Sequence, residues 1–144
     1  MKYKTVIDPE CEEIVIIRAP EYNDRIRNIE KFLASDEAGE LVGYVGESII
    51  PLDVSEVSAF ISEGGAVYAI RCGKRLLIKE RLYALEERLG TRFVRINQSC
   101  IANITKIARF DASLSGSLAV VFKDGYRDYI SRRRLKSVKE RIGF

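Results

Sequence analysis

The chain has 144 residues, of which 47% are hydrophobic and 31% are charged, a composition typical of a soluble globular domain with one core. It contains no histidine, which excludes Ser-His-Asp and Cys-His catalysis as well as histidine-ligated metals. No apolar run approaches the ~20 residues that would span a bilayer, and the first residues lack the apolar core of a signal peptide, so we expect a cytoplasmic protein.

The positive charge of the chain is concentrated in its last third. The formal net charge is only +3 at pH 7. Residues 92–144 contain 12 Lys and Arg against 4 Asp and Glu, which gives +8, whereas residues 1–91 contain 12 against 17, which gives −5. Clustered positive charge favours a polyanionic partner, and the alternative is a basic surface that only faces water.

Cys11, Cys72 and Cys100 are an odd number of cysteines, and no two of them have Cys-x-x-Cys spacing. They predict neither a disulfide framework nor a zinc site, and we expect buried free thiols. The glycine-rich phosphate-binding motifs of nucleotide enzymes do not occur in the sequence. We therefore expect a protein that is not an enzyme and that needs no metal or cofactor.

Residues 1–39 are expected to form a small β/α extension. Two β-branched runs, 5–7 and 14–17, are typical of short strands, and Asp8-Pro9 between them indicates a turn. Residues 22–34 have the apolar spacing of a helix. The apolar stripe of this helix contains Ile26, Ile29 and Leu33, and Phe32 widens it.

This stripe needs a partner surface, because one amphipathic helix cannot bury its apolar side alone. The partner is either the main domain or a second copy of the protein. We therefore interpret the extension as a dimerisation or packing element, which residues 37–40 link to the rest of the chain.

Residues 40–144 have a mainly β pattern of short strands and tight turns, which favours a sandwich or meander. Gly64-Gly65 and Asp124-Gly125 predict hairpin turns. The predicted strands are residues 41–45, 48–52, 57–62, 66–71, 76–78, 93–96, 107–110, 118–122 and 126–130. Two short helices are expected, over 80–89 and over 132–142, and Ser131 is the expected N-cap of the second.

Two segments of the basic region, 92–103 and 131–136, combine apolar anchors with side chains that suit nucleic acid. Arg133 can form a bidentate pair with guanine, and Asn97 or Gln98 can do so with adenine. Another five side chains suit contacts with phosphates: Ser99, Ser131, Arg132, Arg134 and Lys136. Consecutive residues of a helix point about 100° apart, so the three arginines cannot all face one groove.

The order and spacing of these features over residues 40–144 resemble the LytTR DNA-binding domain. Phe93, Arg95, Ser99 and Asn103 match the family motif Phe-x-Arg-x-His-Arg/Lys-Ser-x-x-x-Asn, and Ser131 and Arg133 match its Ser-Arg-Arg segment. Gln98 stands where the family has a residue that enters a major groove. Asn97 replaces the usual histidine, and the loop at 64–66, a third contact in the family, has no large polar side chain here.

The resemblance implies an elongated β fold that inserts loops into successive major grooves of bent double-stranded DNA. It also implies a bacterial transcription regulator, here a stand-alone member without a receiver domain. A regulator that reads paired half-sites gains affinity as a homodimer, so we expect a dimer. The resemblance further suggests a membrane-bound regulatory partner.

Two other functions fit the same sequence. An RNA-binding module could use the same basic surface, although RNA readers usually expose aromatic platforms that are not obvious here. A protein-interaction module could use the N-terminal helix, but it would leave the basic region unexplained. Asn103 is expected to be a buried hydrogen-bonding residue rather than a contact, whereas Arg95 has two open interpretations, a contact residue of the motif or an ion-pair partner of nearby acids.

Overall fold

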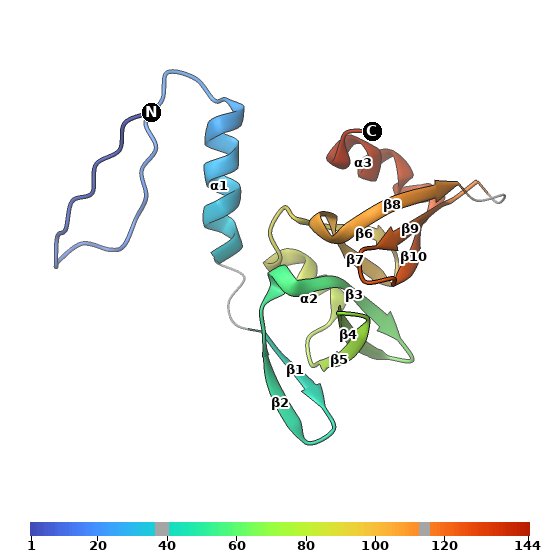
Figure 1. The fold of residues 1–144 in the computed structure, drawn as a ribbon. Coiled ribbons are helices and arrows are strands. Elements are labelled where there is room, and N and C mark those ends of the chain that lie inside the picture. Colours follow the sequence, from blue (N-terminus) through green and yellow to red (C-terminus); the bar gives the residue numbers. More distant parts are fainter. Residues whose placement is uncertain (37–40, 113–115) are drawn as a thin grey trace.

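A computed structural model describes residues 1–36, 41–112 and 116–144 of the chain (Figure 1). The predicted linker at 37–40 lies outside the described residues. What is described forms an N-terminal segment with one helix, a seven-stranded antiparallel sheet and a three-stranded antiparallel sheet. The expectation of a mainly β fold is confirmed.

The N-terminal segment contains a helix but no strand, so the predicted strands at 5–7 and 14–17 are wrong. The turn between them does form, because the Cys11 amide donates to the Asp8 carbonyl at 3.2 Å. The flanking runs do not pair, since an isolated two-stranded hairpin has marginal stability and β propensity depends on a neighbouring strand. Helix α1 (Asp24–Asp36) begins after Asn23, whose side-chain oxygen accepts from the Ile26 amide at 3.0 Å.

The larger sheet has the order β2-β1-β5-β4-β3-β7-β6. Its strands are β1 (Leu41–Val45), β2 (Ser48–Leu52), β3 (Val57–Glu63), β4 (Ala66–Arg71), β5 (Lys74–Ile78), β6 (Phe93–Asn97) and β7 (Cys100–Asn103). The β3–β4 hairpin turns at Gly64 and Gly65, which have φ angles of +59° and +78°. Glycine adopts these angles without the steric cost that a side chain would bring, so the predicted turn is confirmed.

The smaller sheet has the order β10-β9-β8, with β8 (Ile107–Ala112), β9 (Leu118–Phe122) and β10 (Arg127–Ile130). Helix α2 (Leu82–Arg88) connects β5 to β6, and helix α3 (Arg132–Ile142) follows β10 directly. Both helices lie within the predicted ranges. Short 3-10 helices occur at Val54–Glu56 and Ile104–Lys106.

Two apolar clusters lie on opposite faces of the larger sheet. Helix α2 covers one face, where Leu82 and Leu85 pack with Phe60, Leu76 and Ile101. The smaller sheet and α3 cover part of the other face, and this cluster contains Ile61, Ile70, Ile96, Val120, Phe122, Ile130 and Val138. The β6–β7 and β10–α3 segments meet within this second cluster.

The expected burial of the thiols is confirmed only for Cys100, whereas Cys11 and Cys72 are exposed. Cys72 lies in the β4–β5 turn at a φ of +49°, where the tight reversal leaves its side chain outside the sheet. Burial, helped by the nearby Asp128 carboxylate, raises the pKa of the Cys100 thiol well above its usual value. Cys100 therefore behaves as an apolar core residue.

Asp124 connects the two sheets through the turn between β9 and β10. Its Oδ2 accepts from the Ser58 hydroxyl at 2.7 Å and from the Gly73 amide at 3.0 Å, and its Oδ1 accepts from the Tyr126 amide at 3.1 Å. Partial burial opposes ionisation, but the bonds from Ser58 and the backbone amides outweigh it and lower the pKa of Asp124.

Asp124→Asn is expected to reduce the free energy of unfolding by about 1–3 kcal/mol at neutral pH, because charge-assisted hydrogen bonds are lost. Since the folded pKa of Asp124 is depressed, its contribution is present above the unfolded pKa and is lost as pH falls through the folded pKa. Urea unfolding at neutral pH and below about pH 4 measures this difference. Asp111→Asn, which removes partly exposed ion pairs with Arg109 and Arg127, is the control and should cost under about 1 kcal/mol. Equal effects of the two changes would contradict the assignment.

Candidate nucleic-acid interface

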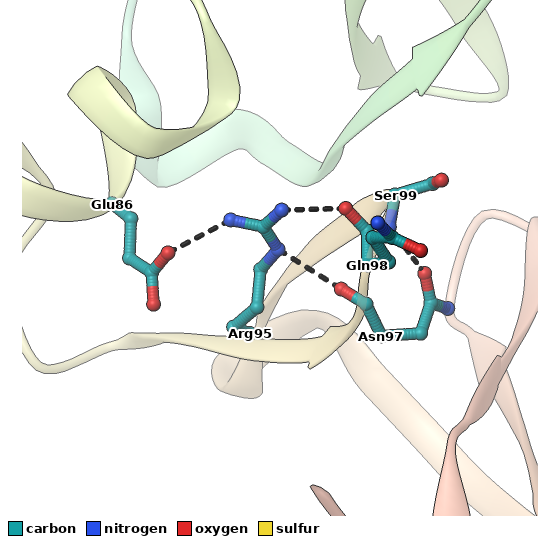
Figure 2. A network of polar contacts seen from close by, with 5 residues as sticks. All are labelled: Glu86, Arg95, Asn97, Gln98 and Ser99. Carbon is teal, nitrogen blue, oxygen red and sulfur yellow. Dashed lines mark hydrogen bonds and ion pairs between the residues drawn. The ribbon is translucent and has the colours of Figure 1, made fainter. Parts of the chain in front are cut away.

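The β6–β7 turn consists of Gln98 and Ser99, and Arg95 holds its backbone in place (Figure 2). The Arg95 Nε donates to the Asn97 carbonyl at 2.9 Å, and another guanidinium nitrogen donates to the Gln98 carbonyl. The third nitrogen pairs with Glu86 of α2 at 2.8 Å, which confirms the ion-pair interpretation of this residue. The Arg95 side chain is only 13% exposed, so it acts as an internal brace of the turn.

Gln98 and Ser99 are both exposed at the tip of this braced turn. The Ser99 amide donates to Asn97 Oδ1 at 2.8 Å, and the Ser99 carbonyl accepts from the Ser62 amide at 2.8 Å. Because these bonds use backbone atoms of the turn, the Gln98 amide group and the Ser99 hydroxyl remain directed to the surface. This geometry suits contact with a base edge and with a phosphate.

Asn97 lies inside the structure, not on its surface, with an exposed fraction of 2%. Its Nδ2 donates to Asp128 Oδ1 at 2.8 Å and to the Tyr129 carbonyl at 2.8 Å, so both amide hydrogens are used. Its oxygen accepts from Ser99. The geometry therefore does not favour the predicted base-reading role of Asn97 and points to a positioning role.

The Ser131 segment is bonded to the β6–β7 segment. The Ser131 amide donates to the Ile96 carbonyl at 3.0 Å, one residue before Asn97. Ser131 occupies the predicted N-cap position of α3, but its side chain makes no capping hydrogen bond, so the hydroxyl is left for another partner. Two segments more than 30 residues apart thus form one rigid unit.

Helix α3 separates the basic residues of its first turns. Val138 is fully buried, and Leu135 and Ile142 pack beside it. Arg134 is half-buried on the flank of this apolar side, whereas Arg132, Arg133 and Lys136 are exposed. Arg133 and Lys136 are three residues apart and share one side of the helix. The three arginines therefore lie on different sides of the helix.

The basic surplus is only partly neutralised. Arg95 pairs with Glu86, both Arg109 and Arg127 pair with Asp111, and Arg141 donates to the Thr91 and Phe93 carbonyls. Within residues 1–36, 41–112 and 116–144, no ion pair involves Arg133 or Lys136. Their charges remain available to a polyanion.

Phe93 and Asn103 of the family motif are structural. Phe93 is 6% exposed and its ring packs on Phe60 at a centroid distance of 5.7 Å. Asn103 is fully buried, donates to the Val57 carbonyl at 2.8 Å and caps the 3-10 helix through the Thr105 amide at 3.1 Å. The structural role expected for Asn103 is confirmed.

A surface cleft of about 500 Å³ lies beside the Gln98 turn. It is lined by Gly65 and Ala66 of the β3–β4 hairpin, by Gln98, and by Arg81 at the start of α2. The hairpin thus adjoins the Gln98 turn, although it brings no large polar side chain. Sequence reasoning missed Arg81, because it belongs to the acidic part of the chain and only the fold places it next to Gln98.

The described part of the chain also bears on membrane and metal binding. None of its helices has the length and apolar character required to cross a membrane. In the same residues, no three His, Cys, Asp or Glu side chains gather in a way that could hold a metal ion.

Comparison with known proteins gives consistent results. The family model of the LytTr DNA-binding domain matches residues 47–143. An uncharacterized HTH-type transcriptional regulator of Staphylococcus aureus strain NCTC 8325 is 36% identical over 134 residues, which cover 92% of this chain and 91% of that protein. A similarly described regulator from the bovine strain RF122 of the same species is 35% identical over the same coverage.

Among solved structures, the LytTr DNA-binding domain of a protein described as a methyl-accepting/DNA response regulator from Bacillus cereus has the same fold. Its TM-score is 0.69 at 19% identity, with 73% of this chain and 97% of that chain covered. In the described residues of our protein, strands separate each α-helix from the next, so the relatives' HTH label does not describe this fold. The matched residues and the shared fold together show that the chain belongs to the LytTR family of DNA-binding domains.

Proposed function

We propose that this protein is a transcription regulator that binds double-stranded DNA sequence-specifically and inserts the Gln98 turn and the start of α3 into successive major grooves. The observation that carries the proposal is the bonded unit of these two exposed segments, in which Ser131 donates to Ile96 and Asn97 donates to Tyr129. Because the hydrogen bonds already hold the two segments together, both can contact one duplex without a further loss of conformational entropy.

The side chains divide into two roles in this proposal. Gln98 and Arg133 read base edges, because an amide and a guanidinium fork can each form two hydrogen bonds to one purine. Ser99, Ser131, Arg132, Arg134 and Lys136 contact phosphates, and Arg81 joins them from the far side of the cleft. Asn97 positions the Gln98 turn and is not among the residues that we propose to contact bases.

We further propose that the regulator is a homodimer and that residues 1–39 contribute to its assembly. The match with the Staphylococcus aureus regulators supports a role for this region, because it covers 92% of the chain and therefore extends into the N-terminal segment. A cytoplasmic location and a membrane-bound regulatory partner stay predictions, which cell fractionation and co-purification with membranes would test.

The direct test of DNA binding uses the duplex from upstream of the protein's own gene, a random duplex and a single-stranded RNA of equal length. We expect the upstream duplex to bind most tightly. Tighter binding of the RNA would contradict the proposal and favour the RNA-binding alternative.

Lys136→Ala is expected to weaken binding to all duplexes nearly equally, because an exposed ammonium group contacts phosphate as a point charge. Each neutralised phosphate adds about −0.9 to the slope of log affinity against log salt concentration. The slope of the variant should therefore be less steep by about 1. Titrations at several salt concentrations measure the slope. Glu140→Gln, on the same exposed side of α3, is the control and should leave the slope unchanged or slightly steeper. An unchanged slope in Lys136→Ala would remove this residue from the interface.

A further inference from the structure

An acidic side chain lies between the two segments that are proposed to contact DNA. Residues 92–144 contain 12 Lys and Arg but only 4 Asp and Glu. One of these acids is Asp128 of β10, three residues before Ser131 and bonded to Asn97, next to Gln98. A carboxylate at this place repels the phosphates of a bound duplex. Charge alone therefore does not favour an acid at this position, whereas its hydrogen bonds do.

The half-buried carboxylate of Asp128 accepts hydrogen bonds from three groups. Its Oδ1 accepts from Asn97 Nδ2 at 2.8 Å and from the Tyr129 backbone amide at 2.8 Å. Its Oδ2 accepts from the Tyr126 hydroxyl at 2.9 Å. Hydrogen bonds to an ionised acceptor are about twice as strong as those between neutral groups. The carboxylate is therefore held firmly by its own strand and by Asn97 of β6.

Tyr126 connects this carboxylate to the larger sheet. The Tyr126 ring packs on Phe122 at a centroid distance of 5.7 Å, and its backbone amide donates to Asp124. Asp124 in turn accepts from the Ser58 hydroxyl of β3. Burial, followed by the charge of Asp128, raises the pKa of Tyr126 well above its usual value, so the hydroxyl keeps its proton and remains a donor. The position of the Asp128 carboxylate is thus fixed relative to both sheets.

The carboxylate also determines which way the Asn97 amide group faces. An ionised carboxylate only accepts hydrogen bonds, so it pairs with the nitrogen of the amide group and not with its oxygen. The Asn97 oxygen is then turned toward the Ser99 amide, from which it accepts at 2.8 Å (Figure 2). This bond closes the turn that exposes the Gln98 side chain. An asparagine in place of Asp128 offers both a donor and an acceptor, so it would not impose one orientation on Asn97.

We propose that Asp128 is a positioning residue for sequence recognition: its carboxylate orients Asn97, and Asn97 holds the Gln98 turn in the geometry that reads bases. The inference rests on the proposed reading of bases by Gln98. Without the carboxylate, the turn must be ordered when it meets the duplex, which lowers the affinity for a specific site. Random duplex is bound through its phosphates and does not require this order. Asp128 thus increases sequence preference, although its charge opposes the binding of any duplex.

Asp128→Asn separates these two effects by their sign. The variant removes a negative charge, so its affinity for random duplex should be unchanged or higher. Its affinity for the duplex from upstream of the gene should fall about tenfold, because hydrogen bonds to a charged acceptor are lost. Competition titrations with the two duplexes measure both affinities. Asp111→Asn is the matched control, since Asp111 pairs with Arg109 and Arg127 instead, and it should change both affinities in the same direction.

A double-mutant cycle shows whether Asp128 acts through Gln98. In a Gln98→Ala background the base contact is already absent, so adding Asp128→Asn should change the affinity for the upstream duplex by less than about twofold. An equal loss in the two backgrounds would show that Asp128 acts independently of Gln98 and would overturn the proposal. A loss for random duplex as large as that for the upstream duplex would also overturn it, because a general structural defect has that effect.

Tyr126→Phe provides the test if Asp128→Asn does not fold. Phenylalanine keeps the ring that packs on Phe122 and removes only the hydroxyl that donates to Asp128. We expect this variant to lose about threefold in affinity for the upstream duplex and to keep its affinity for random duplex. Full preference for the upstream duplex in Tyr126→Phe, or in folded Asp128→Asn, would overturn the role of Asp128 and leave the proposed function standing. If the unmodified protein showed no preference between the two duplexes, the proposed function itself would fail.

Discussion

Asn97→Asp is expected to reduce the free energy of unfolding by about 3–5 kcal/mol at neutral pH and to abolish tight DNA binding. The change keeps the size of the side chain but removes both donors, to Asp128 and to the Tyr129 carbonyl. It also places a second carboxylate next to Asp128 in a site that is only 2% exposed. Because Asn97 bonds the Gln98 turn to β10, the loss should release the turn from its position.

The effect of Asn97→Asp should depend on pH in a defined direction. Burial and the neighbouring carboxylate would raise the pKa of the new aspartate, and its protonated form can again donate one hydrogen bond. The difference in stability from the unmodified protein should therefore be largest at neutral pH and should shrink as pH falls. Urea unfolding at several pH values measures it.

Gln98→Ala is the matched control for this prediction. The Gln98 side chain is exposed, and the bonds that hold the turn use backbone atoms. The variant should keep the stability of the parent and lose DNA affinity. If Asn97→Asp were as stable as the parent and still weakened DNA binding, Asn97 would be a DNA contact and its positioning role would be wrong.

Arg133→Ala should weaken binding to the specific site by about 1–3 kcal/mol and should change binding to random duplex much less. Arg133 is exposed at the start of α3, and its planar guanidinium can bond both O6 and N7 of one guanine. Competition titrations with the specific duplex and a random duplex measure the two affinities.

Arg133→Lys separates the shape of the side chain from its charge. A lysine keeps the charge but cannot form the bidentate pair, so this variant should lose discrimination while it keeps most of its affinity for random duplex. Unchanged thermal melting shows that both variants are folded. If Arg133→Ala weakened specific and random duplex equally, Arg133 would be a phosphate contact.

Local sequence signals predicted most of the elements of this fold. The apolar spacing of α1, the Gly64-Gly65 turn and the leucine spacing of α2 each depend on nearby residues, and each formed as expected. The strands predicted at 5–7 and 14–17 did not form, because strand formation requires a partner strand that the local sequence does not specify.

The sequence predicted which side chains have the chemistry to contact nucleic acid, but not which of them the fold leaves exposed. Gln98 and Arg133 are polar residues next to turns, and the fold leaves both exposed. Asn97 had the same chemical character, but its partners Asp128 and Tyr129 lie 31 and 32 residues farther along the chain. No local pattern reports such a contact, so sequence alone could not separate a positioning amide from a base-reading amide.

The departure of Asn97 from the family's histidine also has a structural meaning. An amide can donate two hydrogen bonds and accept others without carrying charge. In this protein it uses both donors toward β10 and accepts from the Ser99 amide. Asn97 therefore connects the two segments through hydrogen bonds of an uncharged side chain.

The most direct test of the central claim is selection of binding sites from randomised duplex DNA by the unmodified protein, Gln98→Ala and Arg133→Ala. If Gln98 and Arg133 each read bases from one rigid unit, each variant should lose sequence preference at its own base pairs and keep the preference at the other's. The two affected positions should keep the same spacing in every selected site. Loss of preference at all positions in both variants, or at none, would contradict the claim that these two side chains read the sequence.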